Sequence, residues 1–243
     1  MSEPTEFSES GQPIYRHSAP KKEFEFAIGD EQSIQIISDH IEKHLGAPAT
    51  EFHELISDKV HIDVHIIEPT DARPFYTLVT SGMSDKPMNV PAGAEELRYA
   101  ELVICLPPDW PMSQEEWKKD EDGSYWPIRS LKFLARFPHE FDTWLCLDHT
   151  VPNGDPPEAF GQTKFCCAML GAVSTAPQEF WHLKVNDEKT INFFGLYFIY
   201  REEMDLKMKK GAEALWERLE KQDVTELLDP KRKNTAKKLF GLF

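Results

Sequence analysis

Three segments of the sequence are apolar at almost every position and are long enough to form β-strands. They are residues 102–106, 165–173 and 191–200. Because alternate side chains of a strand point to opposite faces of a sheet, a strand that is apolar at successive positions must be covered on both faces. A fold that contains these segments therefore needs a sheet at its centre, with other elements packed against both sides of it.

The remaining predicted elements indicate how this sheet is connected. Further strands are expected at residues 51–56, 59–68, 75–80 and 180–185, and helices at residues 30–45, from Pro127 and from Glu202. The strands come in runs, whereas a doubly wound parallel sheet requires strict alternation of strands and helices. The sequence therefore predicts an α/β (α+β) fold: a single domain with a mixed, mostly antiparallel sheet and packed helices.

The predicted strand at residues 75–80 ends in a polar turn, Ser81-Gly82-Met83-Ser84-Asp85-Lys86-Pro87-Met88. Glycine allows positive φ, Ser and Asp hydrogen-bond to their own backbone, and proline cannot continue a ladder. Scaffolds often present binding groups at strand ends, and methionine adapts to the surface of a partner. The alternative is that this corner only packs against the core. The corner residues predicted to contact a partner protein are Thr80, Ser81, Gly82, Met83, Ser84, Asp85 and Met88.

A second shaped turn, Pro107-Pro108-Asp109-Trp110, follows the predicted strand at residues 99–106. Its prolines end the strand rigidly, so Asp109 and Trp110 are added to the predicted partner-contact residues. Neither turn contains a nucleophile motif, because Ser-Gly-Met-Ser-Asp lacks the flanking glycines of the G-x-S-x-G pattern. No catalytic residue is therefore predicted.

His61, Asp63 and His65 allow a different interpretation, in which they bind a metal ion. Alternation along the strand at residues 59–68 places all three side chains on one face, and imidazole and carboxylate groups are metal ligands. At about 3.3 Å per residue, alternate side chains stand nearly 7 Å apart, so a single ion would require a bent strand. A polar sheet face in which Asp63 pairs with its histidines is favoured, and no cofactor is predicted. A metal-dependent hydrolase remains the alternative function.

The distribution of charge restricts the possible partners. The formal net charge is −15, and the last fifteen residues contribute +4, so the rest of the chain carries −19. Such a body repels nucleic acids and anionic membranes and attracts basic proteins. No apolar run approaches the roughly 20 residues of a membrane span, and the first residues lack the apolar region of a secretory signal. A cytoplasmic location is expected.

Composition also divides the chain into three parts. Residues 1–24 are rich in Ser, Glu and Pro and are expected to form a flexible leader. Residues 25–229 contain the predicted strands and helices and are expected to form the folded domain. Residues 230–243 are rich in lysine and are expected to form a basic tail.

Several short blocks of the sequence resemble one known family. The stretch from Leu78 to Met88 is similar to the central signature of the suppressor of fused domain family. Other blocks agree in the same order: His61-Ile62-Asp63-Val64, residues 101–110, Tyr125-Trp126-Pro127-Ile128 and residues 149–154. The resemblance extends from about Ile34 to about Asp229. It implies an α/β domain that binds other proteins and has no established catalytic centre.

The resemblance also implies a biological role. Eukaryotic members of the family sequester Gli-type transcription factors with the help of a second, C-terminal domain, and this chain ends where the first domain would end. Single-domain bacterial members resemble immunity proteins of polymorphic toxin systems, which neutralise a toxin by direct binding. The predicted function is a non-catalytic protein-binding module of this immunity type, and its acidic body suits a basic toxin domain. The oligomeric state is left open.

Overall fold

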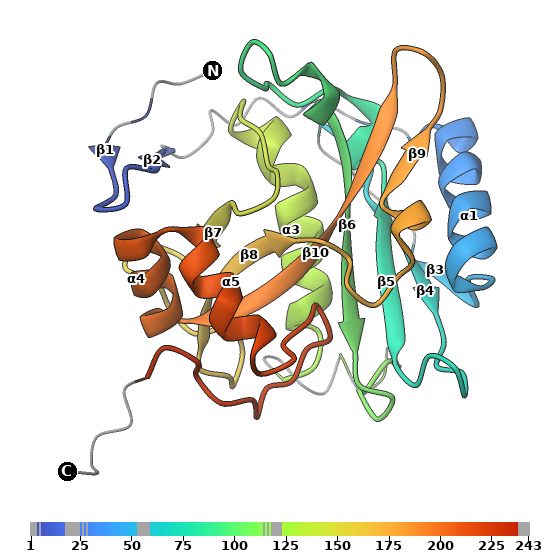
Figure 1. Ribbon diagram of the computed structural model, residues 1–243. Coiled ribbons are helices and arrows are strands. Elements are labelled where there is room, and N and C mark those ends of the chain that lie inside the picture. Colours follow the sequence, from blue (N-terminus) through green and yellow to red (C-terminus); the bar gives the residue numbers. More distant parts are fainter. Residues whose placement is uncertain are drawn as a thin grey trace.

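The computed structural model describes residues 4, 6–17, 25, 27, 29–52, 59–113, 115, 117 and 123–237. An eight-stranded sheet lies at its centre, with seven strands in a continuous order (Figure 1). In spatial order these are β3 (Thr50–Phe52), β4 (Asp63–Ile67), β5 (Tyr76–Ser81), β6 (Tyr99–Leu106), β10 (Thr190–Tyr200), β8 (Phe165–Gly171) and β7 (Thr150–Pro152). The eighth strand, β9 (His182–Lys184), pairs with β10.

The pairing between β6 and β10 joins the two halves of the sheet. These strands run parallel, with Ile191 opposite Tyr99, whereas the other described pairs of this sheet are antiparallel. The first half of β10 pairs with β6 and the second half with β8, because this strand is 11 residues long. The prediction of a mixed, mostly antiparallel sheet is confirmed.

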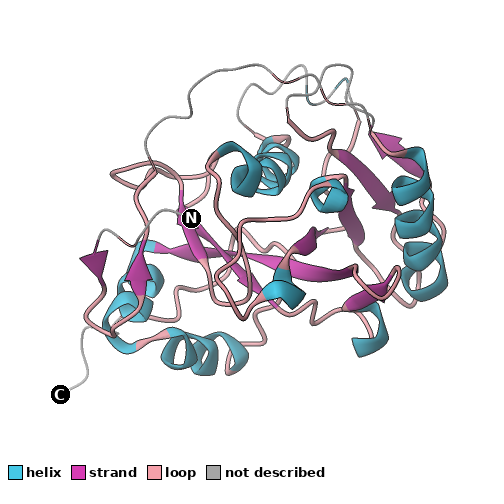
Figure 2. Cartoon of the chain, turned by 90° about the horizontal axis from the view of Figure 1, so that it is seen from above, coloured by secondary structure: helices cyan, strands magenta, loops and turns pink. Residues whose placement is uncertain are grey.

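Helices cover both faces of the sheet, as Figure 2 shows from above. α3 (Trp126–Glu140) packs on one face, in a core that includes Leu102 and Leu196. α1 (Glu31–Leu45) packs on the opposite face, with Val79 and Val103. α4 (Arg201–Lys210) and α5 (Ala212–Glu220) cover the other half of that face, around Tyr197.

Alternation along β10 explains why it is apolar throughout. Phe194 and Phe198 belong to the core on the α3 side, whereas Phe193 and Ile199 belong to the two cores on the other side. Each successive side chain is therefore enclosed, as expected for a central strand. Among the described helices, none is long and apolar enough to cross a membrane.

Both ends of the chain contain structure that was not expected. Residues 6–17, which fall within the predicted flexible leader, include a hairpin of β1 (Glu6–Phe7) and β2 (Pro13–Ile14) beside α4 (Figure 1). The amide of Ser10 donates a hydrogen bond to Met208 O at 3.1 Å. This bond gives a partner to a carbonyl group in the last turn of α4. At the other end, residues 230–237 of the predicted basic tail pack against the domain, and Thr235 is buried. The rest of the predicted leader and tail lies largely outside the described residues.

Candidate functional site

The predicted corner begins where Gly82 turns the chain at the end of β5. Gly82 has a φ of 101°, and a Cβ atom at this position would lie 1.7 Å from the backbone oxygen of His61. Glycine is therefore required, because two backbone segments approach each other closely and φ is positive. The chain continues into one turn of 3-10 helix, η1 (Met83–Asp85), in which Asp85 N donates to Gly82 O at 3.2 Å.

The carboxylate of Glu101, on β6, organises this corner. Its Oε1 accepts hydrogen bonds from the amide (2.9 Å) and the hydroxyl (2.7 Å) of Ser84, and its Oε2 accepts one from the Thr80 hydroxyl (2.6 Å). The Thr80 oxygen in turn accepts the Leu102 amide at 2.8 Å. Burial raises the pKa of Glu101 to about 7, and the three hydrogen bonds oppose that rise. The network ties η1 and the end of β5 to β6.

Most of the predicted partner-contact residues of the corner lie in the interior. The buried ones are Thr80, Ser81, Gly82, Met83, Ser84 and Met88. Side chains enclosed in this way cannot touch a partner in this conformation, and they shape the corner from within. Asp85 is half-buried, and burial raises the pKa of its carboxyl group. The outer face of the corner is therefore formed by Asp85 together with Lys86 and Pro87, which the prediction did not include.

Asp109 and Trp110 lie at the opposite end of β5 from this corner. β5 and β6 are antiparallel, with Tyr76 opposite Leu106, so the turn that follows Leu106 lies beside the start of β5. Asp109 is exposed, and Trp110 is half-buried with its indole N–H donating to Ser124 O at 2.9 Å. The nine residues predicted together are thus divided between two ends of the sheet.

The strand face that suggested a metal site is divided between two separate contacts. His61 Nε2 lies 3.0 Å from Asp63 Oδ1, whereas His65 Nε2 lies 2.9 Å from the hydroxyl oxygen of Ser81. Within the described residues, no group of three His, Cys, Asp or Glu side chains is placed to bind a metal ion. The geometry favours polar pairing inside the fold over a common ligand set, and Asp63 pairs with His61 as that interpretation expects.

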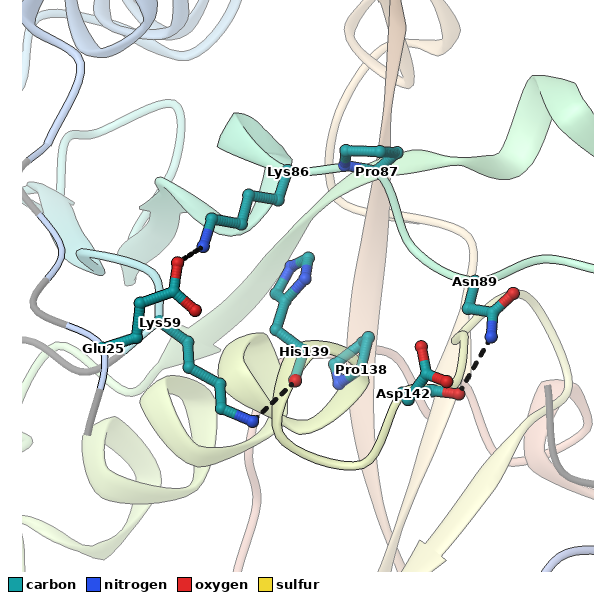
Figure 3. Close-up of a pocket in the computed structure, with 8 residues that line it drawn as sticks. All are labelled: Glu25, Lys59, Lys86, Pro87, Asn89, Pro138, His139 and Asp142. Atoms are coloured by element: carbon teal, nitrogen blue, oxygen red, sulfur yellow. Dashed lines mark hydrogen bonds and ion pairs between the residues drawn. The ribbon is translucent and has the colours of Figure 1, made fainter. Parts of the chain in front are cut away.

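The outer side of the corner borders a pocket of about 300 Å³ (Figure 3). Its lining residues are Glu25, Lys59, Lys86, Pro87, Asn89, Pro138, His139 and Asp142. Lys86 Nζ lies 2.7 Å from Glu25 Oε1, and Lys59 Nζ donates to His139 O at 3.4 Å. His139 Nε2 donates to Met83 O at 2.9 Å and thereby ties α3 to the corner, while burial lowers the pKa of this imidazole. This volume lies at the lower end of the range of about 300–1,000 Å³ that is usual for ligand pockets.

A second buried carboxylate, Glu226, was not predicted from the sequence. It accepts the Thr175 amide at 2.9 Å and the Ser174 amide at 3.1 Å, and the Thr175 hydroxyl at 2.6 Å. The contact holds the loop after β8 to the segment before Leu227, which itself forms a bridge to Cys105 of β6. The available signal was the nearby apolar residues Val224, Leu227 and Leu228, because a glutamate enclosed among apolar side chains needs several donors.

A third buried carboxylate, Glu203, holds the C-terminal segment. Arg232 donates to its two oxygens at 2.7 and 2.6 Å, and the amide and hydroxyl of Thr235 donate at 2.8 and 2.9 Å. Burial raises the pKa of Glu203, but the hydrogen bond and charge of Arg232 outweigh that effect and the pKa is lowered. Glu203 is the third residue of α4, a position at which glutamate commonly caps a helix, and its carboxylate also accepts the amide of Tyr200.

Comparison with known proteins identifies relatives of this fold. A family model described as suppressor of fused protein (SUFU) matches residues 58–233. A crystal structure described as a SUFU homolog from Neisseria gonorrhoeae has a TM-score of 0.60 at 18% sequence identity, and the match covers 86% of this chain and 100% of that chain. A structure described as the Sufu-Fu complex has a TM-score of 0.57 at 13% identity and covers 84% of this chain and 92% of that chain. A search of curated proteins finds no significant match.

The matched residues include the corner, Glu101 and the two other buried glutamates. They also include every residue that lines the pocket except Glu25. The match starts before β4, ends within the C-terminal segment held by Glu203, and spans most of the chain. The predicted resemblance is confirmed, and the chain belongs to the suppressor of fused protein family.

Proposed function

We propose that this chain is a protein-binding module without a catalytic function. The observation that carries this proposal is the use of its buried acids: Glu101, Glu203 and Glu226 each accept several hydrogen bonds from the same chain. A general acid or base must face the space where a substrate binds, whereas these carboxylates hold loops in place. Family membership and the presence of this fold in a structure described as the Sufu-Fu complex support binding of a protein.

The more specific role that we propose is neutralisation of a partner by direct binding, as an immunity protein neutralises a toxin. The body of the chain carries −19, which favours a basic partner and speeds its approach. Asp85, Asp109 and Trp110 are the predicted contact residues that retain some exposure, so they are the ones available to touch a partner. This role would place the chain and its partner together in the cytoplasm.

Co-expression with a toxin-like protein encoded next to the gene tests this role. We expect the two proteins to purify as a complex and the chain to protect the host cell from the toxin. Absence of both binding and protection would overturn the immunity role. Enzymatic turnover that disappears in His61→Ala would overturn the non-catalytic assignment.

A matched pair of variants tests the contact residues. Asp109→Lys reverses an exposed charge on the turn after β6, and Glu188→Lys does the same on the turn between β9 and β10. If Asp109 contacts the partner, we expect its variant to weaken binding at least tenfold in calorimetry while Glu188→Lys changes it less than threefold. Equal effects of the two variants would remove Asp109 from the interface.

A further inference from the structure

The N-terminal segment contacts the folded domain at two separate places, one at the end of α3 and one beside the corner. The ring of His17 packs against Phe137 and Phe141, with both centroid distances at 5.3 Å. Further along, the carboxylate of Glu25 pairs with Lys86 at 2.7 Å, and its backbone oxygen accepts the Lys59 amide at 2.8 Å. The chain therefore places part of its own N-terminal segment on the surface beside the corner.

Glu25 differs from the other residues that line the corner pocket. The remaining seven lie within the matched residues 58–233, whereas Glu25 lies outside them. The family domain thus builds a pocket with two lysines at its rim, and the N-terminal segment adds a carboxylate to it. In Figure 3 the side chain of Lys86 extends toward that carboxylate, whereas the side chain of Lys59 points away from it, toward the backbone oxygen of His139.

We propose that this pocket binds an acidic side chain from an extended segment of the partner protein, and that Glu25 occupies the site until the partner arrives. This inference rests on the proposed protein-binding function and specifies one contact within it. The ammonium group of Lys86 supplies the charge, and the Lys59 amide supplies a hydrogen bond to the backbone of the bound segment. The site therefore recognises a side-chain carboxylate and a backbone carbonyl oxygen that belong to the same residue or to adjacent residues.

The existing contact is of a kind that a partner can replace. The side chains of Lys86 and Glu25 are 44% and 64% exposed, and exposed ion pairs are weak and easily exchanged. The negative charge of the whole body does not prevent an acid from binding here: charges farther than about 8 Å are largely screened at physiological ionic strength. Apart from Glu25, the lining of the pocket itself carries the two lysines, Lys59 and Lys86, against one acid, Asp142. A partner that is basic overall can therefore present one acidic residue to this pocket.

A labelled synthetic peptide with the sequence of residues 21–29 provides the probe, titrated into the full-length chain and followed by fluorescence anisotropy. We expect the variant Arg16→Ala/His17→Ala/Glu25→Ala to bind the peptide at least fivefold more tightly than the unmodified chain. Those three side chains bind the N-terminal segment to the rest of the chain, so their removal should leave the pocket open to the peptide. The same peptide carrying Glu25→Gln should bind at least fivefold more weakly.

A charge exchange separates specific recognition from general attraction. Adding Lys86→Glu to the triple variant should abolish binding of the peptide, and a peptide with Glu25→Lys should restore it. Lys184→Glu is the matched control, because Lys184 is an exposed lysine paired with Asp187 at 2.8 Å, and this change should alter binding less than twofold. Thermal unfolding of each variant checks that Lys86→Glu leaves the fold intact.

Absence of peptide binding, or binding that ignores the charges at positions 25 and 86, would overturn the pocket proposal. A partner protein that binds equally well to Lys86→Glu and to the unmodified chain would also overturn it, while the protein-binding function would stand. Failure to find any protein partner would instead contradict the proposed function and leave the peptide result unchanged.

Discussion

Glu101 shows how one enclosed side chain can hold a turn that looks like a surface feature in the sequence. Polar residues such as Ser84 and Thr80 usually indicate exposure, but here both donate to the same carboxylate and are buried. Burial of a polar group is tolerated when its hydrogen bonds are satisfied. The sequence therefore indicated the turn and its glycine correctly, and it could not indicate that the hydroxyl groups face inward.

Glu101→Gln should change how stability depends on pH. The pKa of Glu101 is about 7 in the folded protein against an ordinary value of 4.5, so the folded state holds the proton more tightly. Its contribution to stability is complete below pH 4.5 and is lost as the pH rises through 7. Between pH 5 and pH 8 the unfolding free energy of the unmodified protein should therefore fall by about 2 to 3 kcal/mol relative to that of the variant.

Urea unfolding of both proteins at pH 5 and pH 8 measures this difference. Burial and the nearby Lys207 lower the pKa of His149 to about 4, but that residue is present in both proteins and its effect cancels in the comparison. An unfolding free-energy difference that is the same at both pH values would show that Glu101 keeps an ordinary pKa.

At the scale of elements, the apolar segments were predicted well because their pattern depends on local alternation. The strand at residues 99–106 and the last strand agree closely with β6 and β10. Their parallel pairing could not be predicted, since periodicity says which faces of a strand are apolar and not which strand lies beside it. The contacts of Arg232 and Thr235 with Glu203 lie beyond the predicted boundary at residue 229, and they could not be predicted because a lysine-rich segment gives no sign of a buried acid partner for Arg232.

Truncation should reveal the role of the C-terminal segment. A chain that ends at Asp229 lacks Arg232 and Thr235, so it leaves the fully enclosed Glu203 without its cation and two other donors. We expect it to lose about 3–5 kcal/mol of unfolding free energy, the usual effect of removing one partner of a buried ion pair. A chain that ends at Lys237 keeps these contacts and is the control in denaturant unfolding. Equal stability of the two chains would contradict this role.

At the scale of the whole molecule, net charge predicts the kinetics of binding. If the partner is a basic toxin domain, the −19 of the body should accelerate its approach, and salt should weaken that effect. The screening length falls from about 10 Å at 0.1 M salt to about 3 Å at 1 M. The association rate should decrease by about one to three decades over this range, with a smaller change in dissociation. Stopped-flow mixing would measure both, and a constant association rate would leave shape and apolar contact as the basis of recognition.

The parallel contact between β6 and β10 has a consequence for how the chain reaches its folded state. β4, β5 and β6 follow one another in the sequence, so the connections between them are much shorter than the long loop that β10 must close before Ile191 meets Tyr99. Contacts that are distant in sequence form slowly because chain entropy is lost before they stabilise the product. Until β10 arrives, the apolar β6 is an open edge that can pair with another chain. Newly made molecules should therefore be most vulnerable to aggregation before residues 190–200 have been incorporated.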